Sequence, residues 1–208
     1  MKDEVMLGKR AALAALIGYP DARIGSVAAS AWAADACPND ESRAAMMRFS
    51  SIVAVSTLSD MEELFTRTFD INPVCSFEIG WHLFGEQYER GAFMVRMRGL
   101  MRQFDIEESA ELPDHLAHAL LLIDRMPSDE AAKLAREILP AVVKMLDGLS
   151  DRKAEGNPYR DLMFVIMEAI RTICMKDAES DQSGLPAGPC SRRDHSRFAA
   201  SGSCAHVD

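Results

Sequence analysis

Apolar residues recur at helical spacing along most of the chain. In segment 87–104, Phe93, Met97 and Met101 lie four positions apart, and segment 159–175 carries a similar apolar stripe. No segment alternates between apolar and polar residues with the period of two that marks a β-strand. The pattern therefore predicts an all-α fold, a single-domain helical bundle of about eight to ten helices.

Capping and turn residues indicate where these helices begin and end. Ser59-Asp60-Met61-Glu62 has the form of a capping box at the start of a short helix. Asp70-Ile71-Asn72-Pro73-Val74-Cys75 is rich in turn-forming residues, so we expect a connection there. Pro113 fits the first turn of a helix that ends near Met126. Pro140 predicts a kink or a break in a later helix.

The composition changes near residue 177. The helical pattern covers residues 3–176, whereas residues 177–208 are rich in Ser and Gly and contain only Leu185 and Val207 as aliphatic residues. So few apolar side chains bury too little surface to order a segment. We therefore expect one all-helical domain over 3–176 and a flexible, disordered tail over 177–208.

The charge and the cysteines narrow the class of protein. The 23 basic and 32 acidic residues give a formal charge of -9, which disfavours binding to nucleic acid or to an anionic membrane surface. No apolar run approaches the roughly 20 residues of a membrane span. The 5 cysteines form no CxxC pair, so they are expected to be reduced thiols of a cytoplasmic protein.

One candidate chemistry is that of a metal- or thiol-dependent enzyme that uses Cys75, His82 and His115. Cys75 lies beside a turn, and either histidine could act as its base. However, no Gly-rich loop precedes Cys75, and its apolar neighbours favour a buried, unreactive thiol. The chain also contains no Walker or dinucleotide phosphate motif.

Metal binding has two candidate sites, and neither has a suitable pattern. His115 and His118 lie three positions apart and lack an obvious third ligand, while Asp114 is more simply a cap for the amides of the following helix. The tail contains cysteine and histidine, but at spacings unlike those of a zinc site. The residues of the tail that could bind a metal are Cys190, His195, Cys204 and His206. We therefore expect no metal site, either at His115 and His118 or in the tail.

A methionine stripe is the remaining pattern of note. Met94, Met97 and Met101 occupy positions i, i+3 and i+7, so they share one helix face. They could pack in the core, or they could line an adaptable groove for a peptide helix.

Several short motifs, in the same order along the chain, resemble one family. Trp81-His82-Leu83-Phe84-Gly85 is similar to the central region of the nitrate reductase delta subunit family of molybdoenzyme assembly chaperones. Glu111-Leu112-Pro113-Asp114-His115-Leu116 is similar to a signature of the wider group that includes the trimethylamine oxide and dimethyl sulfoxide reductase chaperones. The other stretches that resemble the delta subunit family are Leu16–Asp21, Thr66–Pro73, Arg90–Phe93 and Asn157–Tyr159.

The resemblance implies a function in nitrate assimilation without enzymatic activity. Such a chaperone binds the N-terminal segment of the apo catalytic subunit of a molybdoenzyme, here of the nitrate reductase type. It supports molybdenum cofactor insertion before export or membrane docking, and it holds no cofactor of its own. An acidic protein suits a basic amphipathic client peptide. With the methionine stripe included, the expected client-binding residues are Phe69, Asp70, Pro73, Trp81, Met94, Met97, Met101, Glu111, Pro113, Asp114 and His115.

Overall fold

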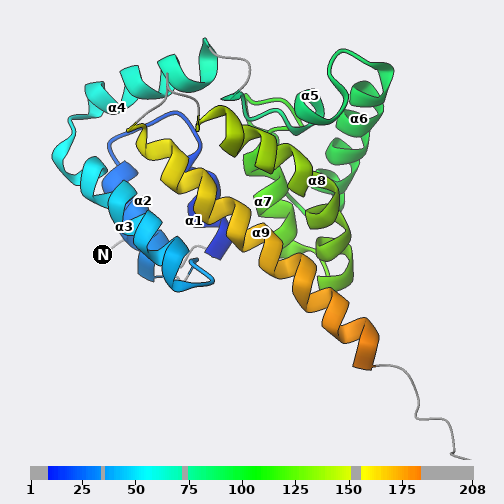
Figure 1. Cartoon of the computed structure of the whole chain (residues 1–208). Helices are drawn as coiled ribbons and strands as arrows, with labels where there is room; N and C mark the ends of the chain where they lie inside the picture. Colours follow the sequence, from blue (N-terminus) through cyan, green and yellow to red (C-terminus); the bar gives the residue numbers. More distant parts are fainter. Residues whose placement is uncertain (1–8, 34–35, 72–74, 151–155, 184–208) are drawn as a thin grey trace, which may run out of the picture.

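The computed structural model describes residues 9–33, 36–71, 75–150 and 156–183, with the side chains of 32–33 and 176–183 left out. Within these ranges the chain forms nine α-helices and one π-helix (Figure 1), which confirms the predicted all-α fold. The elements are α1 (Lys9–Leu16), α2 (Ile24–Ala33), α3 (Asp40–Val55), α4 (Leu58–Phe65), the π-helix η1 (Thr66–Asp70), α5 (Ile79–Phe84), α6 (Tyr88–Gln103), α7 (Leu116–Arg125), α8 (Ser128–Gly148) and α9 (Pro158–Ser183).

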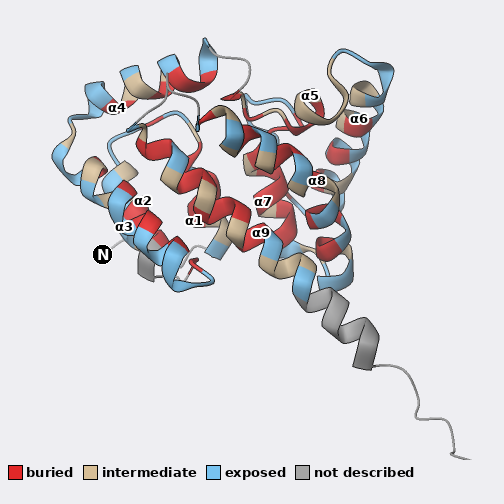
Figure 2. Ribbon diagram, viewed as in Figure 1, coloured by how far each residue is buried: buried red, intermediate tan, exposed pale blue. Residues whose placement is uncertain are grey.

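Helix α9 runs diagonally through the molecule (Figure 1) and packs against α3 and α8. Its side chains Leu162, Val165 and Ile166 are completely buried, and Figure 2 shows that buried residues follow the first half of the helix. Helix α1 packs against α2 and α7, while α5 packs against α6 and α8. No helix in the described ranges is long and apolar enough to cross a membrane.

Three predicted helix boundaries are wrong. The capping box of α4 consists of Thr57 and Asp60, not of Ser59 and Glu62, because the extended backbone of Thr57 lets its hydroxyl accept a hydrogen bond from the Asp60 amide at 3.2 Å. Helix α7 begins at Leu116, so Pro113 precedes the helix and is not in its first turn. Helix α9 continues to Ser183, beyond the segment 159–175 whose apolar stripe predicted it.

Pro140 lies inside α8 and does not break it. Its ring is exposed, whereas Ala135, Ile138 and Ala141 around it are completely buried. The packing of α8 against α9 therefore holds the helix together across the position where an amide hydrogen bond is missing.

An aromatic cluster fastens η1 to the body of the protein. The rings of Phe69 and Phe77 stack with their centroids 4.0 Å apart, and Tyr159 of α9 meets the Phe69 ring edge-on at 5.0 Å. The side-chain amide of Asn157 also donates to the hydroxyl of Thr68, in the middle of η1, at 2.8 Å. These contacts fix a short element whose hydrogen-bond geometry is uncommon and is often found at functional sites.

Candidate functional site

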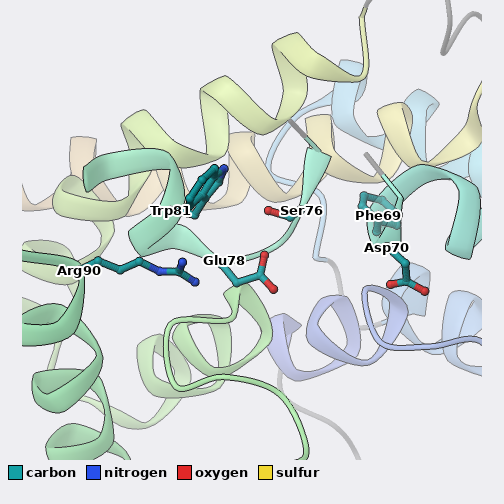
Figure 3. A pocket seen from close by; sticks show the side chains of 6 residues that line it. All are labelled: Phe69, Asp70, Ser76, Glu78, Trp81 and Arg90. Carbon is teal, nitrogen blue, oxygen red and sulfur yellow. The ribbon is translucent and has the colours of Figure 1, made fainter. Parts of the chain in front are cut away.

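A surface cleft of about 450 Å³ opens beside η1, between this element and the start of α6 (Figure 3). We call it the Trp81 cleft; it is lined by Phe69, Asp70, Ser76, Glu78, Trp81 and Arg90. Phe69, Asp70 and Trp81 were predicted from the sequence, and the structure brings these three together. Ser76, Glu78 and Arg90 were not predicted as site residues.

Arg90 joins the surface of the cleft to a buried carboxylate. Its guanidinium carbon lies 5.7 Å from the centre of the Trp81 ring, within the range of a cation–π interaction. Its Nε atom donates to Oδ2 of Asp114 at 3.4 Å. Asp114 thus holds the guanidinium of Arg90, and Figure 3 shows the Arg90 side chain among the residues that line the cleft.

Asp114 is completely buried, and it ties three segments together. Besides Arg90 of α6, its Oδ2 atom accepts a hydrogen bond from the amide of Gly80 in α5 at 3.2 Å. Burial raises the pKa of Asp114, and the positive charge of Arg90 opposes that effect. The predicted role of Asp114 as a helix cap is therefore wrong, because its carboxylate is committed to residues distant in sequence.

Gly80 is required by this arrangement. A Cβ atom at position 80 would lie 2.7 Å from Oδ2 of Asp114 and 3.0 Å from Cγ of Arg90. The same two segments are also joined through the backbone, since Glu78 and His115 form an antiparallel bridge in which the Ile79 amide donates to the Asp114 carbonyl at 2.9 Å. The side-chain contacts of Asp114 and the backbone bridge thus hold the segment before α7 firmly against the start of α5.

The N-cap of α7 is His115, not Asp114 as the sequence predicted. Its Nδ1 atom accepts a hydrogen bond from the amide of Ala117 at 3.2 Å, and its ring meets Phe77 edge-on with centroids 5.4 Å apart. Burial, with a smaller contribution from the nearby His118, lowers the pKa of His115 to about 4. His118 is itself buried and bonded to the hydroxyl of Ser109 at 2.9 Å.

The methionine stripe does not form an exposed groove. Met97 and Met101 are completely buried and Met94 is half-buried, so the interpretation of this stripe as a peptide-binding face is wrong. Helix α6 packs against α5 and α7, and its four-residue apolar spacing is that of a helix with one face toward the core.

The other predicted client-binding residues do not line the Trp81 cleft. Glu111 is exposed and Pro113 is buried, and both belong to the segment that leads into α7. Asp114 and His115 lie behind the cleft and do not form its surface. Pro73 lies outside the described residues.

The local chemistry does not favour the alternative of a thiol- or metal-dependent enzyme. Cys75 is buried, and burial raises the pKa of its thiol, which disfavours the reactive thiolate. His82 is bonded through Nε2 to the carbonyl of Ser76 at 2.8 Å, and His115 caps α7. Among the described residues, no three His, Cys, Asp or Glu side chains are placed to hold a metal ion. The cysteines and histidines of the tail lie outside the ranges that the structure describes.

The fold and the cleft define an all-helical protein with a surface site suited to binding, in which the half-buried ring of Trp81 lies with the carboxylates of Asp70 and Glu78 and the guanidinium of Arg90. The model of the nitrate reductase delta subunit family matches residues 35–155, and the chain belongs to this family. The matched range contains the whole Trp81 cleft together with Asp114 and His115.

Two curated relatives carry the same description. The chain is 26% identical over 153 residues to the nitrate reductase molybdenum cofactor assembly chaperone NarJ of Escherichia coli strain K12. The aligned residues cover 71% of this chain and 64% of the relative. The values for the protein of the same description from Escherichia coli O157:H7 are identical. The chain thus spans a little under two thirds of the length of these relatives.

Proposed function

We propose that this protein is a chaperone for the assembly of a molybdoenzyme of the nitrate reductase type and is not itself an enzyme. The observation that carries this proposal is the family match over residues 35–155, which includes every residue of the Trp81 cleft. The relatives named as nitrate reductase molybdenum cofactor assembly chaperones support the same function. The molybdenum cofactor is then cargo for the client and not a resident group of this chain.

The proposal extends to the part of the client that is bound. The chaperone acts in the cytoplasm on the N-terminal segment of the apo catalytic subunit, holding it until the cofactor is inserted and only then permitting export or membrane docking. The half-buried ring of Trp81 offers apolar surface, and Asp70 and Glu78 offer negative charge. In the described part of the chain neither carboxylate takes part in an ion pair. A basic amphipathic segment complements such a surface.

Asp114 and His115 contribute indirectly in this proposal. Asp114 positions Arg90 against Trp81, and His115 fixes the start of α7 beside Phe77. They keep the cleft in a binding shape before the client arrives, which reduces the entropy lost on binding.

Copurification tests this function. The tagged protein is expected to retain the apo catalytic subunit of the nitrate reductase of the same organism. Trp81→Ala should reduce retention about tenfold, since an aromatic anchor of an interface commonly contributes more than 1 kcal/mol. Val95→Ala is the matched control, because Val95 is on α6, is 72% exposed and lines no part of the cleft.

Two results would contradict the proposal. One is that the wild-type chain retains no catalytic subunit. The other is that it retains the cofactor-loaded subunit as well as the apo form, since a chaperone for cofactor insertion must release its client afterwards.

A further inference from the structure

A second pocket borders η1, the element that also lines the Trp81 cleft. Its volume is about 440 Å³, and we call it the Tyr19 pocket. The residues that matter for its chemistry are Tyr19, Glu62, Glu63, Thr66, Arg67 and Ile71. They come from the turn after α1, from α4 and from η1 with the residue that follows it.

The pocket exposes two large apolar side chains. Tyr19 is 57% exposed and Ile71 is 73% exposed. The Tyr19 ring is nevertheless held in place, because it meets the ring of the buried Phe65 edge-on with centroids 5.6 Å apart. A fixed and exposed aromatic ring is typical of an anchor at a protein interface, since it offers much contact area without a large entropic loss.

The polar rim of the pocket carries excess negative charge. Glu62 and Glu63 outnumber Arg67, and across the described ranges none of these three side chains takes part in an ion pair. Their charges are thus available to a partner. The Trp81 cleft has the same character, with Asp70 and Glu78 beside aromatic rings.

The two pockets share η1 as a common ridge. Thr66 and Arg67 line the Tyr19 pocket, whereas Phe69 and Asp70 line the Trp81 cleft. Thr68 between them is buried, and its hydroxyl donates to the Leu64 carbonyl at 2.6 Å while accepting from Asn157 at 2.8 Å. The ridge is therefore anchored from below at its middle residue.

We propose that the Tyr19 pocket binds a second part of the same client segment, so that one basic amphipathic peptide crosses η1 and fills both pockets. An apolar side chain of the peptide packs on Tyr19 and Ile71, and a Lys or Arg side chain faces Glu62 and Glu63. The continuity across η1 and the matching charge of the two pockets select this occupant. The inference rests on the proposed function, because it concerns the same client.

Fluorescence anisotropy with a labelled synthetic peptide tests the inference. The peptide has the sequence of the N-terminal segment of the apo catalytic subunit, and it is titrated with the full chain. Ile71→Ser is expected to weaken binding about tenfold, the loss of one large apolar contact at an interface. Val55→Ser is its matched control, because Val55 is 85% exposed and lines neither pocket.

A charge variant gives an independent readout. Glu62→Gln combined with Glu63→Gln should weaken binding about fivefold at low salt, and the difference from wild type should shrink as salt rises. Glu89→Gln is the control for a general effect of net charge, because Glu89 is exposed and lines neither pocket.

The outcomes separate this inference from the proposed function. If Trp81→Ala weakens binding while Ile71→Ser and the double glutamine variant bind like wild type, the inference is overturned and the proposed function stands. If the wild-type chain does not bind the peptide at all, both are overturned. If Ile71→Ser abolishes self-association of the chain and leaves peptide binding unchanged, a second copy covers the pocket and the inference is again wrong.

Discussion

Replacing His115 by asparagine removes a buried ionisable ring and keeps a side chain that caps helices well. The ring lies against Phe77 and His118 at the start of α7, and the carboxylate of Glu78 also acts on it. Because burial lowers its pKa from 6.5 to about 4, the folded protein binds this proton less readily than the unfolded chain does. The neutral ring therefore stabilises the fold above pH 6.5, and that stability is lost as the pH falls toward 4.

The size of the effect follows from the two pKa values. With a folded pKa of about 4 and an unfolded pKa of 6.5, the free energy of unfolding should fall by about 2 kcal/mol between pH 7 and pH 5 on account of His115 alone. His115→Asn lacks this contribution. The stability difference between wild type and variant should hence be about 2 kcal/mol smaller at pH 5 than at pH 7.

Urea unfolding at both pH values measures the difference directly. Carboxylates and His82 titrate in both proteins, so their contributions cancel in the comparison. Val95→Ala serves as a control whose difference from wild type should not depend on pH, because neither side chain is ionisable. A stability difference between wild type and His115→Asn that is the same at pH 7 and pH 5 would refute the assigned burial and pKa of His115.

Two further substitutions test the floor of the cleft and the anchor of η1. Gly80→Ala places a Cβ atom 2.7 Å from Oδ2 of Asp114, so thermal unfolding should show that the free energy of unfolding falls by about 1–3 kcal/mol. Gly91→Ala is the control, because open space surrounds position 91 and the free energy of unfolding should not fall. Equal stabilities of the two variants would contradict the tight contact at Gly80. Asn157→Ala removes the hydrogen bonds to Thr68 and to the amide of Tyr159, and should lower the free energy of unfolding in urea by about 1–2 kcal/mol. A change below about 0.5 kcal/mol would show that η1 is not anchored there.

The helical spacing of the sequence was sufficient to predict the fold class, because most helices here are held by one apolar face. It identified the apolar face of α6, but it could not show what covers that face. Met97 and Met101 proved to be core residues, because α6 packs against α5 and α7 in the folded chain. The same limit applies to η1, because its position depends on contacts with Phe77, Tyr159 and Asn157, which lie further along the chain.

Asp114 shows why the candidate site was only partly predictable. Beside a helix start, an aspartate is usually a cap, and that local rule favoured the wrong role. Its real partners, Gly80 and Arg90, lie 34 and 24 residues away in the sequence. Arg90 stands in the Arg90–Phe93 stretch that carries the family resemblance, so that stretch could have drawn attention to it. Glu78 had no comparable signal, and in the fold an antiparallel bridge joins it to His115, a residue distant in sequence.

Cofactor loading of the client tests the central claim most directly. Apo catalytic subunit, produced without this chaperone, is incubated with a source of molybdenum cofactor and with wild-type chain, Trp81→Ala, Val95→Ala or no addition, and molybdenum per catalytic subunit is measured. The account predicts that wild type and Val95→Ala raise the molybdenum content, while Trp81→Ala leaves it near the level without chaperone. Equal loading in all four samples would contradict it.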